Sequence, residues 1–234
     1  MTRAVFFDAG HTLLYAHPDI GSVYAGVTES FGIRLAADRF AETFVPVFKE
    51  TTKIYSATST ASDRQDYAMW QDITRRIYDR LPSLSAIPFD DWFQSLYRRF
   101  GEPSAWRFYD DVVSVLGDLR SRGLKIGIVS NWDTRLKLIC DGLGLTPLVD
   151  FIVISAEVGV RKPDPGIFRL ALDKAGVRPE EAIHVGDLPE EDAEGARRAG
   201  VRPVLIDRKK RITPQGVPAG VPRVTSLAEL FPLL

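Results

Sequence analysis

The sequence predicts an α/β protein: a three-layer α/β/α core built on a parallel sheet, with an all-helical insert. Short apolar runs alternate with helical patterns from about residue 110 onward, which is typical of a parallel sheet covered on both faces. An apolar run at 4–7 predicts one more strand before the insert. Residues 33–100 contain no glycine, and aromatic residues recur there at helical spacing. We therefore expect a core formed by residues 1–15 and 103–234, and a helical domain formed by residues 16–102.

The helices of the insert are predicted by apolar residues that recur three or four positions apart. The three sets are Phe40, Phe44 and Phe48, then Trp70, Ile73 and Ile77, then Phe89, Phe93 and Tyr97. The stretch 56–66 is small and polar, so we expect it to form a loop between two of these helices.

The remaining core elements follow the insert in alternation. Buried strands are predicted at 125–129, 151–154, 183–185 and 203–206, and helices at 112–119, 136–143, 165–175 and 190–199. Asp164 and Pro165 suit the cap and the first turn of the third of these helices. Arg208 to Arg211 form a basic run after the last strand. Because the rest of the chain is not basic, we expect this run to be a solvated turn.

Charge balance and cysteine content exclude several classes of protein. The chain has 30 Lys and Arg against 31 Asp and Glu, so it lacks an overall positive field that would attract nucleic acid or an anionic membrane. The single cysteine, Cys140, excludes an internal disulfide and a site with several thiolate ligands. The apolar run before Asp8 is too short for a signal peptide, and none approaches the roughly 18 residues of a membrane span. We expect a cytoplasmic globular protein, either a monomer or a homodimer.

Polar residues follow the predicted strands at the edge where parallel sheets bind ligands. Asp8 follows the first strand, Ser130-Asn131 the second, and Asp187 the fourth, with Asp192 close behind; Lys162 lies in the loop after the third. Two carboxylates and backbone oxygens suit a hard cation such as Mg²⁺, and the amine, hydroxyl and amide suit a phosphoryl group. Each of these residues alone is a weak signal, but together they indicate one crevice.

The ordered set resembles the four motifs of the haloacid dehalogenase superfamily, over nearly the whole chain. The matching segments are Phe6-Phe7-Asp8 through Thr12-Leu13-Leu14, Ile128-Val129-Ser130-Asn131, Lys162-Pro163-Asp164-Pro165-Gly166-Ile167-Phe168, and His184-Val185-Gly186-Asp187 through Asp192, Gly195-Ala196 and Gly200. The resemblance implies a Rossmann-like core with a mobile helical cap inserted between the first and second motifs. It also implies a Mg²⁺-dependent phosphatase of a small phosphorylated metabolite.

The same resemblance implies a role for each matching residue. Asp8 is expected to be the nucleophile and to form an aspartyl intermediate. Ser130 and Lys162 are expected to hold the transferring group. The expected substrate-binding residues are Thr12, Ser130, Asn131 and Lys162, and the expected metal-binding residues are Asp8, Gly10, Asp187 and Asp192.

One departure from the family pattern bears on the chemistry. Phosphatases of the family usually carry a second Asp two residues after the nucleophile, as general acid and base, and here that position is Gly10. Gly10 keeps the backbone carbonyl for a metal but offers no proton. His11 is a possible substitute because its ordinary pKa lies near neutrality. Two alternatives therefore remain open: an inactive or weakly active scaffold, and an enzyme that cleaves a carbon–halogen or carbon–phosphorus bond.

Overall fold

The computed structural model describes residues 1–55 and 57–234 and confirms the predicted three-layer α/β/α arrangement. Six parallel strands form one sheet in the order β5-β4-β1-β6-β7-β8. Their bounds are β1 (Ala4–Phe7), β4 (Lys125–Ser130), β5 (Phe151–Ile154), β6 (Ala182–Gly186), β7 (Arg202–Ile206) and β8 (Arg223–Val224). β1 lies between β4 and β6, although about 120 residues separate it from β4 in the sequence, as expected for a discontinuous core.

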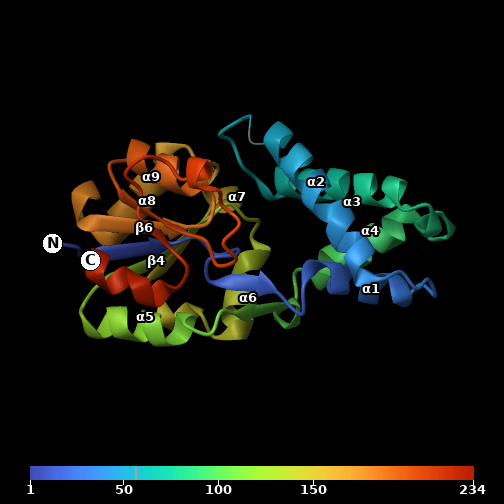
Figure 1. Ribbon diagram of the computed structural model, residues 1–234, viewed down its shortest axis with the longest axis horizontal. Coiled ribbons are helices and arrows are strands. Elements are labelled where there is room, and N and C mark those ends of the chain that lie inside the picture. Colours follow the sequence, from blue (N-terminus) through green and yellow to red (C-terminus); the bar gives the residue numbers. More distant parts are fainter. Residues whose placement is uncertain (56) are drawn as a thin grey trace.

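Alternate residues of β1 pack against helices on opposite faces of the sheet. Val5 and Phe7 belong to a hydrophobic cluster with α5 (Val112–Ser121) and α6 (Arg135–Leu143), whereas Ala4 and Phe6 belong to one with α8 (Pro165–Ala175). Figure 1 shows α5 and α6 on one side of the strands and α8 and α9 (Gly195–Arg198) on the other. Burial on both faces explains why these strands are continuous apolar runs.

A separate helical module lies to one side of the sheet, and both chain termini lie at the opposite end of the core (Figure 1). It consists of α1 (Ile20–Glu29), α2 (Ala37–Tyr55), α3 (Asp63–Arg80) and α4 (Phe89–Arg99), with a 3₁₀ turn at Pro82–Ala86. Its own buried cluster includes Tyr24, Phe40, Ile73, Ile77, Trp92 and Phe93. The aromatic residues that predict these helices therefore form the interior of the module.

The module joins the core through a short antiparallel ribbon that the sequence patterns do not predict. β2 (Leu14–Ala16) pairs with β3 (Trp106–Phe108), so the chain leaves and re-enters the core side by side. The predicted boundary between residues 15 and 16 falls within β2. That division of the chain, at 15/16 and 102/103, remains a prediction.

Two predicted elements differ from the structure in extent. The loop predicted at 56–66 ends earlier, because the Ser62 side chain caps α3 by accepting from Gln65 N at 3.2 Å; residue 56 itself lies outside the described residues. The helix predicted at 190–199 begins as a π-helical turn, Pro189–Glu194, and continues as α9. A π-turn is common at functional sites, and here it contains Asp192.

The remaining core elements are short. They are α7 (Ser155–Val158) and 3₁₀ turns at Pro103–Ala105, Thr146–Leu148, Pro179–Glu181, Pro214–Gly216 and Leu227–Leu233. None of the helices in residues 1–55 and 57–234 combines the length and apolar character needed to cross a bilayer.

Candidate active site

Three of the predicted site residues stand at the carboxyl ends of neighbouring strands. Asp8 follows β1, Ser130 ends β4, and Asp187 follows β6. Because β1 pairs in parallel with both β4 and β6, these three ends lie side by side at the centre of the sheet. This is the edge at which ligands bind in open parallel sheets.

Asp8 is buried and is held through one carboxylate oxygen. Its Oδ1 accepts hydrogen bonds from Lys162 Nζ at 2.7 Å and from Ser130 Oγ at 2.9 Å, whereas Oδ2 accepts none from the described residues. Burial raises the pKa of Asp8; Lys162 opposes this rise and the charge of Asp192 adds to it. The lysine and the serine therefore stabilise the ionised carboxylate that burial disfavours.

Lys162 connects Asp8 to Asp192. Its Nζ donates to Asp192 Oδ1 at 2.6 Å, and the residue is only 1% exposed. Burial would lower the pKa of Lys162, but the charges of Asp192 and Asp8 raise it above its usual value, so the ammonium keeps its charge. Asp192 Oδ1 also lies 2.9 Å from His184 Nε2, and its Oδ2 accepts from Leu188 N at 2.9 Å. Burial would raise the pKa of Asp192, but Lys162 and His184 hold it below its usual range.

Asn131 holds the backbone around Lys162. Its Oδ1 accepts from Lys162 N at 2.8 Å, and its Nδ2 donates to Lys162 O at 2.9 Å and to Glu191 Oε2 at 2.8 Å. Both ends of the amide therefore have protein partners. The contacts give Asn131 a positioning role, while its predicted role in substrate binding stays a prediction.

Three carboxylates converge beside Lys162 and could hold a metal ion. Asp8, Asp187 and Asp192 each place an oxygen within 4.8 Å of the other two. Burial raises the pKa of Asp187 well above its usual value, and the charges of Asp8 and Asp192 raise it further. No side chain in the described part of the chain donates a hydrogen bond to Asp187. Clustered oxygen ligands with unbalanced negative charge are what Mg²⁺ requires, so these residues fit the metal that the motifs imply.

The loop after Asp8 differs from its neighbours in backbone conformation. Gly10 lies under Trp132, because a Cβ atom at Gly10 would come within 3.3 Å of Trp132 Cζ3. His11 is exposed and adopts a left-handed backbone (φ 55°), with its N–H donating to Leu14 O at 2.7 Å. The buried hydroxyl of Thr12 has no hydrogen-bond partner among the described residues.

Three further residues lie at the site. His184 contacts Asp192, Trp132 covers Gly10, and Glu191 bonds to Asn131. Burial raises the pKa of Glu191 to about 7, although Lys162 opposes the rise. The spacing of Glu191 from Asp187 gives a weak signal, but a histidine inside an apolar strand and a tryptophan after a strand are equally typical of a packed core.

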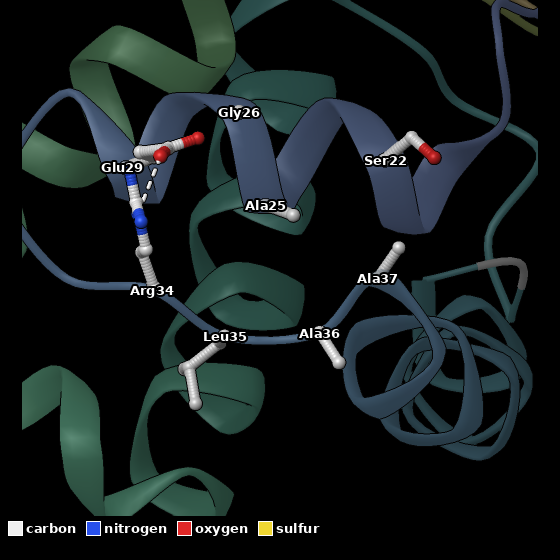
Figure 2. Close-up of a pocket in the computed structure, with 8 residues that line it drawn as sticks. All are labelled: Ser22, Ala25, Gly26, Glu29, Arg34, Leu35, Ala36 and Ala37. Atoms are coloured by element: carbon white, nitrogen blue, oxygen red, sulfur yellow. Dashed lines mark hydrogen bonds and ion pairs between the residues drawn. The ribbon is translucent and has the colours of Figure 1, made fainter.

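The site at the strand ends is distinct from a hollow on the helical module. That hollow has a volume of about 530 Å³ and lies between α1 and the segment that leads into α2 (Figure 2). Ser22, Ala25, Glu29 and Arg34 are among its lining residues, and Glu29 and Arg34 form an ion pair at 2.7 Å across it. It contains none of the residues that converge around Asp8.

Comparisons with known proteins identify the family. The family model described as haloacid dehalogenase-like hydrolase matches residues 2–200. Haloacid dehalogenase-like hydrolase domain-containing protein 3 of Bos taurus is 30% identical over 235 residues, covering 99% of this chain and 93% of that protein. Phosphoserine phosphatase of Thermus thermophilus is 42% identical over 136 residues, covering 56% of this chain and 53% of that protein.

Solved structures share the fold of this chain. A solved dehalogenase structure superposes with a TM-score of 0.73 at 24% identity, covering 100% of this chain and 97% of that one, and this likeness shows the fold alone. The family match covers the strand ends that carry Asp8, Ser130, Lys162 and Asp187. The chain therefore belongs to the haloacid dehalogenase-like hydrolases.

Proposed function

We propose that this hydrolase is a phosphatase that acts on a small phosphorylated metabolite through an aspartyl-phosphate intermediate on Asp8. The observation that carries the proposal is the asymmetry of the Asp8 carboxylate. Lys162 and Ser130 donate to Oδ1, and no described residue donates to Oδ2. One oxygen is thus fixed while the other is available as a nucleophile. The similarity to phosphoserine phosphatase of Thermus thermophilus supports a phosphorylated substrate.

The reaction has two displacements at phosphorus. Asp8 Oδ2 forms a bond to phosphorus while the bond to the alcohol oxygen breaks, and the alcohol oxygen leaves nearly as an anion and takes a proton from solvent. Water then attacks the same phosphorus, the Asp8–phosphorus bond breaks, and inorganic phosphate leaves. Lys162 and Ser130 hold Asp8 in line and place positive charge and a donor beside the phosphoryl oxygens.

Four groups of this chain would hold a divalent cation, for which we propose Mg²⁺. They are the carboxylates of Asp8, Asp187 and Asp192, which lie together in the structure, and the backbone carbonyl of Gly10, which the family resemblance implies. When bound, the cation supplies positive charge next to the phosphoryl oxygens. Asp187 is the least constrained of the three carboxylates, whereas Asp192 already accepts hydrogen bonds from Lys162 and Leu188.

We also propose that residues 16–102 act as a cap that covers the strand ends and selects the substrate. Two acidic residues of α3 support this role, because they bind core loops on either side of the site. Asp63 accepts from Thr134 N at 2.8 Å, and Asp66 accepts from Arg161 Nη2 at 2.6 Å. Thr134 closely follows β4, and Arg161 directly precedes Lys162.

Product analysis with two substrate classes tests the proposed function. Purified protein is incubated with a panel of phosphomonoesters and, separately, with 2-chloropropionate, each with Mg²⁺ and with a chelator. We expect release of inorganic phosphate that depends on Mg²⁺, and no release of chloride. Chloride release that persists with the chelator would replace the phosphatase with a dehalogenase. If neither product forms across the panel, the inactive-scaffold alternative gains support.

A further inference from the structure

The basic run that follows β7 lies at the same edge of the sheet as the carboxylates. β7 pairs in parallel with β6, so Asp207 and the residues after it leave the sheet next to Asp187. The run Arg208 to Arg211 was expected to be a solvated turn. The structure corrects this expectation for Arg208, which is largely buried and hydrogen-bonded.

Arg208 binds the basic run to the loop that carries the nucleophile. Its Nη2 donates to Thr12 O at 2.8 Å, and its Nη1 donates to Asp111 Oδ1 and Oδ2 at 2.8 and 2.7 Å. The guanidinium also lies 4.2 Å from the centre of the Tyr109 ring. These contacts fix Arg208, and with it the neighbouring residues of the turn, close to the first motif.

The turn itself has an ordered backbone. The Asp207 carboxylate accepts from Arg211 N and from Ile212 N, both at 2.9 Å, and from Arg223 Nη2 at 2.7 Å. Lys210 adopts a left-handed conformation (φ 53°), which completes the turn. Lys209 and Arg211 are thus carried on an ordered turn in which the Asp207 carboxylate binds the Arg211 and Ile212 amides.

Lys209 and Arg211 remain available to a ligand. Both are exposed, and within the described part of the chain neither side chain has a hydrogen bond or an ion pair. Lys209 contributes to the lowered pKa of Asp19, although the hydrogen bond from Ser22 is the larger cause.

Lys209 and Arg211 lie on the turn after β7, at the edge of the sheet where the substrate is proposed to bind. His11 lies three residues after the nucleophile, and Asp19 caps α1 of the helical module. Arg208 bonds the turn that carries Lys209 to Thr12 O, so this turn lies beside the segment that leads from Asp8 toward the helical module. An exposed cation with no protein partner in this position matches an anionic group on a ligand.

We propose that Lys209 and Arg211 form a cationic rim that binds a second anionic group of the substrate, away from the phosphoryl group that is transferred. The inference rests on the proposed function and narrows its substrate class to phosphomonoesters that carry a further carboxylate or phosphate. The rim determines specificity and does not contact the reacting atoms.

Matched pairs of substrates test the rim. Glycerol 3-phosphate and 3-phosphoglycerate differ by a carboxylate, and fructose 6-phosphate and fructose 1,6-bisphosphate differ by a phosphate. The measured quantity is the ratio of kcat/KM within each pair, for the wild type, Lys209→Gln, Arg211→Gln and the double variant. Lys174→Gln is the control, because it removes one exposed charge from the carboxyl end of α8. That end of the helix lies at the opposite edge of the sheet from the site.

We expect the wild type to prefer the more anionic member of at least one pair. The ratio should fall about three- to fivefold in each single variant and about tenfold in the double variant, and stay constant in Lys174→Gln. The preference should also weaken as salt is raised to 0.5 M. The pair that responds identifies the second group as carboxylate or phosphate. The rim is overturned if the ratio in the double variant equals that of the wild type. This includes the case in which kcat/KM falls equally for both members of a pair.

A binding measurement keeps this test separate from the proposed function. The same probes are titrated into Asp8→Asn, with and without the rim substitutions, and the dissociation constants are compared. If the wild type hydrolyses none of the phosphates but the double variant still weakens binding of the more anionic probe, the phosphatase proposal fails and the rim stands. If binding of the paired probes is equal in every variant, the rim fails regardless of activity.

Discussion

Trp132 occupies the space above Gly10, with its Cζ3 atom 3.3 Å from the position of a Cβ at that glycine. The indole is supported from behind by Trp106, whose ring centre lies 4.9 Å away in an edge-on arrangement. A side chain at position 10 would crowd the Trp132 ring, which would have to shift by a few tenths of an ångström. The lack of a side chain at Gly10 and the position of Trp132 are therefore linked, because the apolar indole lies next to the place where the expected general acid would begin.

Replacing the nucleophile should abolish turnover. Asp8→Asn keeps the shape of the side chain but removes the attacking charge, so kcat should fall by about 10⁴-fold or more. The fold should survive, because Lys162 retains its ion pair with Asp192. Phosphate release and circular dichroism measure the two effects. Asp38→Asn, at an exposed position of α2, is purified in parallel to report any contaminating phosphatase. An Asp8→Asn enzyme with most of the wild-type rate would contradict covalent catalysis.

Removing the metal and substituting Asp187 should lower kcat by similar amounts. Lys162 alone cannot balance the charge of a phosphoryl group beside the Asp8, Asp187 and Asp192 carboxylates. We expect a loss of about 10²–10³-fold in kcat after chelation or in Asp187→Asn, the scale of losing one electrostatic stabiliser. Added Mg²⁺ should restore the chelated wild type and only partly restore the variant. Full activity in chelated wild type would argue against the metal site.

Most of the site was predictable because it depends on short-range patterns. An apolar run that stops at Asp8, Ser130 or Asp187 marks a strand end, and parallel strand ends meet at one edge. Lys162 was predictable as part of a motif, but its bridge between Asp8 and Asp192 depends on the π-turn that positions Asp192.

The remainder depends on contacts between distant segments. The β2–β3 ribbon pairs residues that lie about 90 positions apart, and both strands are only three residues long. Such short strands have no pattern of their own. The ribbon places Trp106 beside Trp132, so the cover over Gly10 could not be predicted either. Arg208 was misjudged for the same reason, because its partners Thr12 and Asp111 lie far away in the sequence.

The contact between α3 and the loop before Lys162 should contribute to stability. Asp66 and Arg161 are 4% and 7% exposed and form an ion pair at 2.6 Å. Arg161→Met leaves a buried carboxylate without its partner, so the free energy of unfolding should fall by about 3–5 kcal/mol. The double variant Asp66→Leu/Arg161→Met should recover most of this loss. Urea unfolding measures both, with Arg76→Met, which breaks an exposed pair on the same helix, as the control. A loss in Arg161→Met no larger than in Arg76→Met would contradict the contact.

Asp111 should make stability depend on pH. Burial alone would raise its pKa, but hydrogen bonds from Arg208, Ser226 and Leu227 N hold it below the usual value. A carboxyl group whose pKa is lower in the folded state stabilises the fold above its unfolded pKa of about 3.9, and this stabilisation disappears as pH falls through the folded pKa. The difference in unfolding free energy between the wild type and Asp111→Asn should therefore be largest near pH 7 and shrink below about pH 4.

Urea unfolding between pH 3 and pH 7 measures this difference. Asp110→Asn is the matched control, because the neighbouring Asp110 is exposed and accepts no hydrogen bond from the described residues. We expect its difference from the wild type to stay nearly constant with pH. A parallel pH dependence in both variants would assign the effect to general charge and would remove Asp111 as its source.

Because position 10 carries no carboxylate, turnover should depend strongly on the leaving group. Without a general acid, the alcohol oxygen departs nearly as an anion, so nitrophenyl phosphate should be hydrolysed much faster than alkyl phosphates. Gly10→Asp supplies the acid but crowds the indole, whereas Gly10→Asp/Trp132→Phe also supplies space. The double variant should raise alkyl phosphate turnover toward the roughly 10²–10⁴-fold scale of general acid–base catalysis, and raise nitrophenyl phosphate turnover much less. Trp132→Phe alone is the control.

A weak leaving-group dependence in the wild type, with no gain in a well-folded double variant, would mean that another group already transfers the proton. His11 is the nearest candidate, and its left-handed backbone (φ 55°) decides how to test it. His11→Ala would strain this conformation, whereas His11→Asn tolerates it and removes only the imidazole. Loss of alkyl phosphate turnover in His11→Asn would assign the proton to His11, because a structural role would affect both leaving groups equally. Unchanged turnover would leave the cap or solvent as its source.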